Sequence, residues 1–277
     1  MKNTLFLLFL LFAAPVFSQE EGEEPADKVP YSFYEGQVVY LLADSIHVRA
    51  EPSSSSASVT RLAIGTKLTI LSETDVITKL NGIYMPWYYV QFNGKKKGYV
   101  WGGKIARTSF RSYANNSYAF HFGLEKIAEG DYDDVFYQIR VEKDNKEVQR
   151  LSFQGFGLGY KEHSCTNSGN RGITTLDDVI YVDASAEYCG DGGGSLVFFR
   201  SGGKLTMVKQ LWDMMDAPMF TSNYFIFPSD MEGEKGKIIL HEEDGEIMDS
   251  DKDPGGRVVY SKNKNTKLTW NGSELVK

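Results

Sequence analysis

The stretches "IHVRAEPSSSSASVTRLAIGTKLTIL", residues 46–71, and "WYYVQFNGKKKGYVWGGKI", residues 87–105, decide the fold of the front part of the chain. In the first of them, apolar Ile46 and Val48 alternate with polar neighbours. Alternation with a period of two is typical of a half-buried β-strand. Short strands at close spacing, with turn residues between them, predict a small β-barrel.

Two polar segments connect the predicted strands. The four serines, residues 53–56, follow Pro52 and lie between strands of one unit. Proline fixes φ and cannot pair in a sheet, so we interpret the serines as a connecting loop and not as an interdomain linker. Asn93-Gly94 predicts a tight hairpin, because both residue types tolerate the positive φ that a type I′ turn demands.

Together these motifs resemble the bacterial SH3 domain over about residues 36–107. The family pattern is an apolar residue followed by Asn, Val and Arg, a loop of small residues with Pro, and a strand ending in Gly. A Trp-x-x-Val strand, a hairpin and Gly-Trp-Val follow. The matching positions are Val48, Arg49, Pro52, Gly65, Trp87, Val90, Gly98 and Val100. Two positions depart from the pattern: His47 stands where Asn is usual, and Tyr99 stands where Trp is usual.

The resemblance implies binding, not catalysis. Similar domains occur on secreted and envelope proteins, many of which bind peptidoglycan or its stem peptides. The family pattern makes Val90 a core residue, which places Trp87 and Tyr89 on the outward face of their strand. Aromatic rings can stack on sugars or apolar side chains, and lysines can meet stem-peptide carboxylates. The candidate ligand-binding residues are therefore Tyr84, Trp87, Tyr89, Lys95, Lys96, Lys97 and Trp101.

Each of these candidates also has a plainer interpretation. A tryptophan in a small barrel is often a core residue. A lysine run after a hairpin turn is often a solvated edge that discourages aggregation.

The first 18 residues have the features of a secretory signal peptide. Lys2 is followed by an apolar core from Leu5 to Phe12 and by small residues before a cleavage site after Ser18. The core is shorter than the roughly 20 residues that cross a bilayer, and no later apolar run is long enough. We therefore expect an exported protein, periplasmic or extracellular, with no membrane span in its mature form. Residues 19–35 predict an acidic, disordered leader.

The formal net charge of −7 is unevenly distributed. Residues 19–37 carry a net charge of −5, residues 38–107 a net charge of +5, and residues 108–277 a net charge of −8. Such asymmetry indicates separate domains, which we place at residues 36–107 and 108–277. Nucleic acid is a poor partner for an exported chain with this balance.

Residues 108–277 predict a larger all-β domain. Short connections between sequential strands favour an antiparallel meander, and a propeller-like array, a sandwich and an open barrel all remain compatible. The segment "LWDMMDAPMF", residues 211–220, is interpreted as an apolar loop. The predicted strands are residues 117–123, 134–141, 147–153, 177–184, 194–200, 204–211, 223–228, 237–242, 257–262 and 267–272.

Cys165 and Cys189 are the two cysteines of the chain. In an exported protein they most simply form one disulfide, which closes a loop of about 24 residues and adds a few kcal/mol of stability. His163 lies two residues before Cys165, but no second ligand pair has zinc spacing. We expect no metal and no cofactor.

The sequence shows no familiar catalytic motif. Gly-x-Ser-x-Gly and His-Glu-x-x-His are absent, and neither cysteine stands in the setting of a Cys-His wall peptidase. The sequence therefore predicts an exported, non-enzymatic protein that binds peptidoglycan or an envelope protein. The alternative is a cell-wall hydrolase, or a regulator of one, with no recognisable catalytic motif.

Overall fold

The structure, a computed structural model, describes residues 28–128, 134–156, 160–186, 192–250 and 253–277. These residues form antiparallel β-sheets with a short 3₁₀ turn, η2 (Gly102–Lys104), so the all-β prediction is confirmed. The predicted signal peptide and residues 19–27 of the predicted leader lie outside the described residues. The prediction of disorder is wrong for the end of the leader, because Phe33 is buried in the core and its backbone N–H donates to Tyr88 Oη at 3.1 Å. No helix among the described residues is long and apolar enough to cross a membrane.

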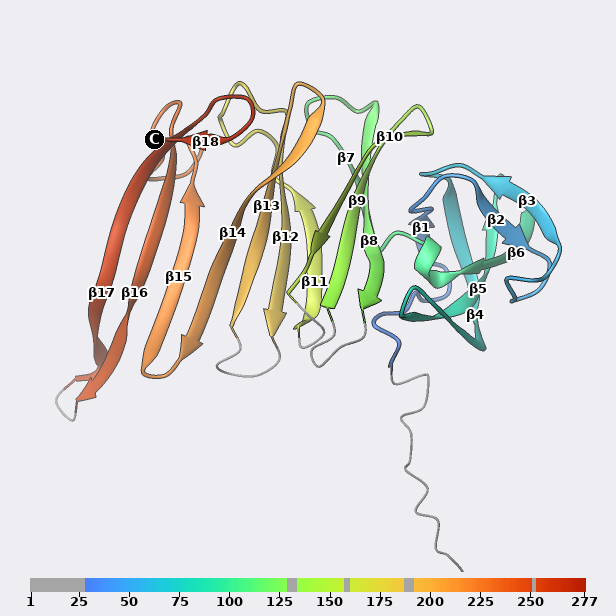
Figure 1. Ribbon diagram of the computed structural model, residues 1–277, viewed down its shortest axis with the longest axis horizontal. Helices are drawn as coiled ribbons and strands as arrows, with labels where there is room; N and C mark the ends of the chain where they lie inside the picture. The colour runs from blue at the N-terminus through green and yellow to red at the C-terminus, as the bar shows by residue number, and fades with distance from the viewer. Residues whose placement is uncertain (1–27, 129–133, 157–159, 187–191, 251–252) are drawn as a thin grey trace, which may run out of the picture.

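The first sheet is a curled half-barrel at one end of the molecule (Figure 1). Its strand order is β1-β4-β5-β6-β2-β3. The predicted serine loop is confirmed, because it connects β2 to β3 and these strands pair with each other. The strands are β1 (Val38–Tyr40), β2 (Ile46–Arg49), β3 (Ser58–Leu62), β4 (Lys67–Leu80), β5 (Ile83–Phe92) and β6 (Lys96–Trp101).

The second sheet has four strands in the order β10-β9-β8-β7. Each strand pairs with its neighbour along the chain, as predicted for an antiparallel meander. The strands are β7 (Thr108–Arg111), β8 (Tyr118–Ala128), β9 (Asp134–Lys143) and β10 (Lys146–Gln154).

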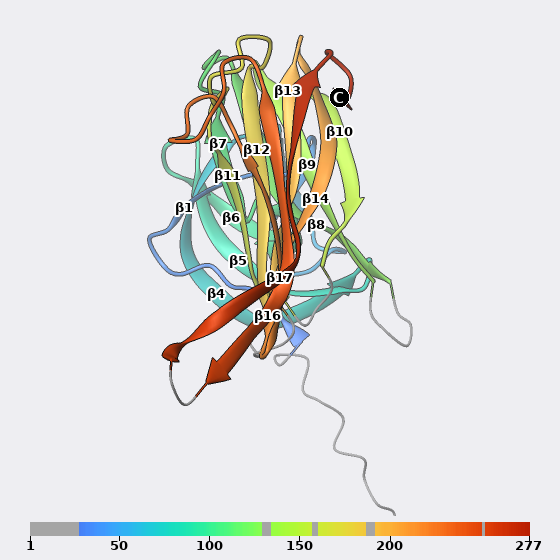
Figure 2. The same ribbon diagram turned by 90° about the vertical axis from the view of Figure 1, so that its left-hand side faces the viewer.

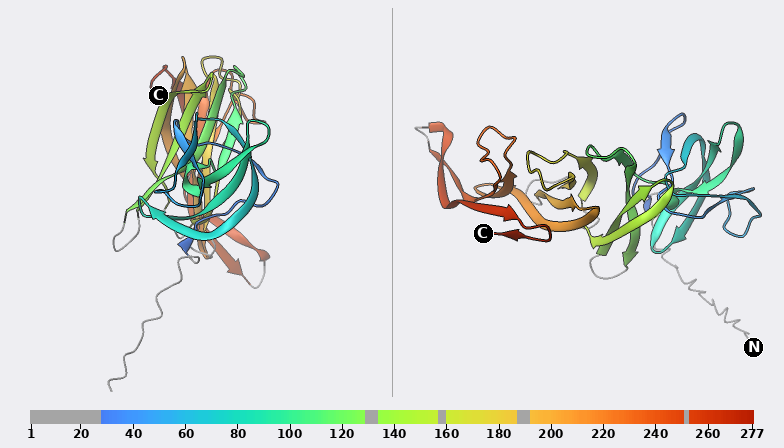
Figure 3. Two further views of the ribbon diagram at one scale, coloured as in Figure 1. Left: turned by 90° about the vertical axis from the view of Figure 1, so that its right-hand side faces the viewer. Right: turned by 90° about the horizontal axis from the view of Figure 1, so that it is seen from above.

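The third sheet continues the meander through eight strands, from β11 to β18 in chain order. Figure 1 shows these strands following one another away from the half-barrel, and Figure 3 shows from above that the sheets are curled. The strands are β11 (Tyr160–Asn167), β12 (Asp178–Ala186), β13 (Gly193–Ser201), β14 (Lys204–Asp216), β15 (Met219–Ile226), β16 (Ile238–Ser250), β17 (Asp253–Trp270) and β18 (Leu275–Val276).

Three sequence-based predictions for this region are wrong. Residues 160–167, for which no strand was predicted, form β11. Residues 211–220 are not a loop, because β14 extends to Asp216 and β15 begins at Met219. The two strands predicted at 257–262 and 267–272 are one strand, β17.

Pairing with β16 explains the length of β17. The polar segment that suggested a turn, "SKNKNT", lies opposite the acidic part of β16, with Lys264 opposite Glu242. Lys262 Nζ lies 3.0 Å from Glu242 Oε1. The ladder and these opposite charges favour the extended conformation over the local turn preference. Figure 2, viewed from this end, shows β16 and β17 in front of the other strands.

Two apolar cores share strand β13, whose residues from Leu196 to Arg200 are all buried. Leu196 and Phe198 belong to a core that extends to the half-barrel, whereas Val197 and Phe199 belong to a second core. The second core lies against the later strands and includes Trp270. The run "LVFF" is therefore continuous because both faces of β13 are covered.

The half-barrel is docked on the second sheet through backbone hydrogen bonds. Arg107 N donates to Phe122 O at 2.8 Å, and Ile127 N donates to Asn81 O at 3.0 Å. Packing is equally close, since a Cβ built on Gly123 would lie 2.8 Å from Leu42 Cδ2. Apolar residues of the half-barrel and of β8 belong to the same core.

Candidate functional site

The outer face of the half-barrel carries two tyrosines side by side. Tyr89 in β5 lies opposite Tyr99 in β6, and their ring centroids are 4.9 Å apart with 37° between the ring planes. The hairpin that connects these strands turns at Asn93 and Gly94, with φ of 43° and 87°. The predicted hairpin is therefore confirmed. Its geometry fixes the register that places the two rings together.

Polar and basic side chains continue this row across the sheet. Ser72 of β4 lies opposite Tyr89, and Arg49 of β2 lies opposite Tyr99. Lys97 Nζ lies 5.9 Å from the centre of the Tyr89 ring, within the range of a cation–π contact. We call this surface the tyrosine face, and it consists of Arg49, Ser72, Tyr89, Gln91, Lys97 and Tyr99.

A hollow of about 470 Å³ adjoins the tyrosine face. Gln91 belongs to both, because it lines the hollow and lies opposite Lys97 in the sheet. Asn145, from the β9–β10 connection, lines the hollow from the second sheet. A ligand on the tyrosine face therefore has room to extend toward the neighbouring sheet.

Trp87 and Trp101 are buried, with 3% and 4% of their surfaces exposed. The expectation that Trp87 faces outward is therefore wrong. Trp87 Nε1 donates to Thr78 Oγ1 at 2.8 Å, and Trp101 Nε1 donates to the carbonyl oxygens of Thr78 and Met85 at 3.0 and 3.1 Å. Both indoles therefore lie against the β4–β5 hairpin, whose Thr78 and Met85 accept their N–H groups.

The other predicted ligand residues, Tyr84, Lys95 and Lys96, lie outside the tyrosine face. Tyr84 lies near the far end of β5, with Lys79 Nζ 5.0 Å from its ring centre. Lys95 and Lys96 are exposed at the β5–β6 hairpin, beside Lys97. Of the seven predicted residues, Tyr89 and Lys97 belong to the tyrosine face.

Sequence reasoning missed Tyr99 as a site residue. The Asn-Gly turn carried the signal for it, because counting outward from that turn pairs Tyr99 with Tyr89.

His47 and Arg49 of β2 contact the end of the serine loop and the start of β3. His47 Nδ1 is hydrogen bonded to Ser58 Oγ at 2.8 Å, and Arg49 donates from its guanidinium to Ser56 O at 2.8 Å. His47 therefore links β2 to β3 at the position where the family pattern has Asn.

Cys165 is buried in β11, opposite Val182. Burial raises the pKa of its thiol well above the usual value. Cys189 lies outside the described residues, so the Cys165–Cys189 disulfide stays a prediction. Within the described ranges, no group of three or more His, Cys, Asp or Glu side chains is arranged to hold a metal ion.

A buried polar group lies where the half-barrel meets the second sheet. Ser109 Oγ is hydrogen bonded to His121 Nδ1 at 2.8 Å, while Glu142 Oε2 lies 3.8 Å from His121 Nε2, beyond hydrogen-bond distance. Burial lowers the pKa of His121 to about 4. The imidazole of His121 is therefore neutral at pH 7.

Residues 44–106 match the family model of the bacterial SH3 domain, and the rest of the chain matches no family model. No curated protein and no solved structure matches the chain. The matched segment contains strands β2 to β6 of the half-barrel and all six residues of the tyrosine face. Residues 44–106 are a bacterial SH3 domain.

Proposed function

We propose that the protein is an exported binding protein whose tyrosine face binds the stem peptides of peptidoglycan. The bacterial SH3 domain itself suggests a binding role related to the cell wall. The observation that supports the finer proposal is the adjacent pair Tyr89 and Tyr99, with Lys97 beside it.

The chemistry of this face suits a short peptide with carboxylates. Two adjacent rings offer apolar area with polar hydroxyl tips, which suits small aliphatic side chains. Lys97 and the neighbouring Lys95 and Lys96 add positive charge at the same edge, and residues 38–107 carry a net charge of +5. A peptide that carries several carboxylates complements this charge.

The proposal is tested with the full mature chain and purified sacculi in a co-sedimentation assay. Tyr89→Ala and Tyr99→Ala should each weaken retention by about 1–3 kcal/mol, roughly 5- to 150-fold, because each removes an aromatic anchor. Tyr34→Ala is the control, since Tyr34 is 71% exposed and lies outside the tyrosine face. Retention should also fall as salt rises, because exposed charges are screened over about 10 Å at moderate ionic strength.

Three results would contradict the proposal. A folded chain that is not retained on sacculi at low salt would exclude the wall as the ligand and favour an envelope protein. Retention that both tyrosine variants leave unchanged would place the wall-binding site elsewhere. Export predicts a mature N-terminus at Gln19, so secreted protein that begins at Met1 would contradict that part.

A further inference from the structure

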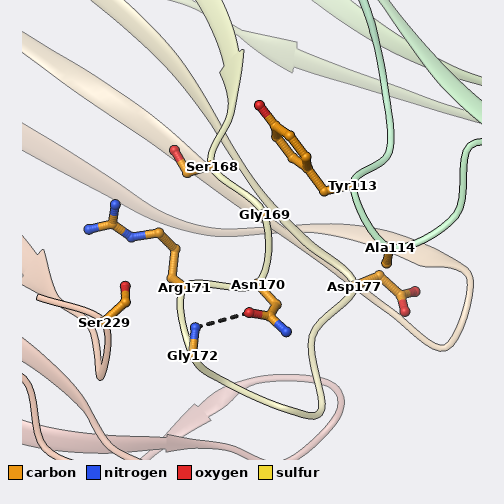
Figure 4. A pocket seen from close by; sticks show the side chains of 9 residues that line it. All are labelled: Tyr113, Ala114, Ser168, Gly169, Asn170, Arg171, Gly172, Asp177 and Ser229. Atoms are coloured by element: carbon orange, nitrogen blue, oxygen red, sulfur yellow. Dashed lines mark hydrogen bonds between the residues drawn. The ribbon is translucent and has the colours of Figure 1, made fainter.

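A second hollow, of about 510 Å³, lies outside the SH3 domain where β7 and β11 end (Figure 4). Three segments that are distant in the sequence enclose it. Tyr113 and Ala114 follow β7, residues 168–172 and Asp177 belong to the β11–β12 connection, and Ser229 follows β15.

A buried carboxylate fixes the position of these segments. Asp178 is fully buried and accepts hydrogen bonds from Ser112 Oγ at 2.6 Å, from Tyr113 N at 2.9 Å and from Asn167 Nδ2 at 2.8 Å. Its partners thus come from the ends of β7 and β11. A buried carboxylate with several donors holds its surroundings firmly, so the lining is preorganised.

Tyr113 supplies an aromatic surface at this hollow. Its side chain is 75% exposed, although its backbone is anchored by Asp178. The Gly169 backbone lies close to the ring, since a Cβ built on Gly169 would be 3.7 Å from Tyr113 Cδ2. An exposed, positioned aromatic ring is a surface on which a sugar ring can stack.

The charged groups of the lining have partners of opposite charge. Arg171 forms an ion pair with Asp230, and Asp177 Oδ2 lies 3.3 Å from a guanidinium nitrogen of Arg200. Because both charges are compensated within the protein, the hollow favours a neutral ligand over a free anion or cation.

The remaining polar groups suit a ligand with many hydroxyls. Asn170 Oδ1 accepts from Gly172 N at 3.0 Å, which orients the amide and leaves Nδ2 to donate to a ligand (Figure 4). Ser168 and Ser229 contribute hydroxyls that both donate and accept. Figure 4 shows Ser168 between the ring of Tyr113 and the side chain of Arg171.

We propose that this hollow binds a neutral oligosaccharide, with one pyranose ring stacked on Tyr113 and its hydroxyls hydrogen bonded to Asn170 and the two serines. The site belongs to the third sheet and to the end of β7, and it goes beyond the proposed function of the SH3 domain. A cell-wall glycan and an unrelated polysaccharide share the required pyranose chemistry, so the test includes one probe for each source.

The experiment is isothermal titration calorimetry on the full mature chain, with tetra-N-acetylchitotetraose and cellotetraose as probes. We expect saturable binding of at least one probe. Binding of the first alone would identify an amino-sugar glycan, and binding of both would identify pyranose chains in general. Tyr113→Ala should lower the affinity at least about tenfold, as expected for the loss of a stacking anchor. Tyr113→Phe keeps the ring and should bind within about threefold of the native chain, while Asn170→Ala should weaken binding.

Controls separate this site from the tyrosine face and from misfolding. Tyr34→Ala removes an equally exposed tyrosine and should leave the affinity unchanged. Both probes lack a stem peptide, so failure here and failure of the sacculus assay are distinguishable. Circular dichroism confirms that each variant is folded. Absence of saturable binding to either probe would overturn the proposal, as would affinity that Tyr113→Ala and Asn170→Ala leave unaltered. Competitive displacement by inorganic phosphate would also overturn it, because an anion would then be the ligand.

Discussion

The backbone of Gly82 lies directly against the carbonyl group of Ile127. A Cβ built on Gly82 would stand 1.9 Å from Ile127 O, far inside the contact distance. Gly82 also has a φ of +78°, in the left-handed region. This turn between β4 and β5 is therefore a contact point between the SH3 domain and β8, and only glycine fits both its conformation and its surroundings.

Gly82→Ala should therefore destabilise the protein by more than the cost of placing alanine at a positive φ. Gly94→Ala is the matched control, because Gly94 has a φ of +87° and no atom of the described residues lies within 4 Å of its built Cβ. We expect the free energy of unfolding to fall by about 1 kcal/mol for Gly94→Ala and by at least about 2–3 kcal/mol for Gly82→Ala, since the added methyl group of Gly82→Ala also forces the two sheets apart.

Urea denaturation of both variants measures these costs. Equal losses would show that the Gly82 contact contributes nothing beyond its φ. The close docking inferred for the SH3 domain would then be wrong.

The shared apolar core predicts that the SH3 domain depends on the rest of the chain. Leu41 and Ile105 are fully buried and belong to the same core as Phe120 and Phe122 of β8. A fragment of residues 28–107 would expose this surface, at a cost of about 25 cal/mol for each Å² of apolar area. The fragment should melt at a lower temperature than the full chain and bind a hydrophobic dye. On heating, the SH3 domain and the other sheets of the full chain should unfold in one transition. A fragment as stable as the full chain would contradict the prediction.

Trp87 and Tyr89 are two positions apart in β5 but should respond differently to substitution. Trp87 is 3% exposed and its indole N–H is satisfied by Thr78. Trp87→Ala should cost about 3–5 kcal/mol of stability, as for other buried large aromatic residues. Tyr89→Ala should change stability by less than about 1 kcal/mol and should act on binding instead. Thermal melts compared with sacculus retention separate these effects, and a Trp87→Ala variant with native stability would contradict the packing described.

Local signals account for the parts of the fold that the sequence predicted correctly. The alternation in β2 and the Asn93-Gly94 turn involve residues close together in the chain, so pattern reading finds them. The burial of Trp87 has no such signal. It depends on how far β4 and β5 bend, and their ladder shifts register between Glu73 and Ile77.

The hollow beside Tyr113 was also beyond local pattern reading. Asp178 holds it together with partners 65 and 66 residues earlier in the chain. The single strand β17 is a further case, because its turn-like polar segment is extended by pairing with β16. In both cases contacts between distant segments decide the structure, and single-residue preferences do not report them.

Two buried histidines predict a loss of stability in mild acid. Burial, the largest cause, lowers the pKa of both His121 and His163 to about 4, and Arg111 and Arg107, respectively, lower it further. The unfolded chain binds a proton at each histidine below a pH of about 6.5, whereas the folded chain does so only near pH 4. Stability should therefore fall as the pH drops from about 6.5 to 4, by up to about 3 kcal/mol for each histidine, and it should change little from this cause below pH 4.

His163→Phe isolates one of these contributions. The His163 ring lies 4.8 Å from the Tyr137 ring, and its buried Nε2 has no hydrogen-bond partner among the residues that the structure describes. Phenylalanine keeps the ring contact and removes the titrating group, so the variant should be at least as stable as the native chain at pH 7. Between pH 6.5 and 4.5 it should lose less stability than the native chain, although its carboxylates titrate as before. Urea denaturation across this range measures the difference. If the two curves run parallel, His163 does not set the acid sensitivity, and the loss arises from other groups.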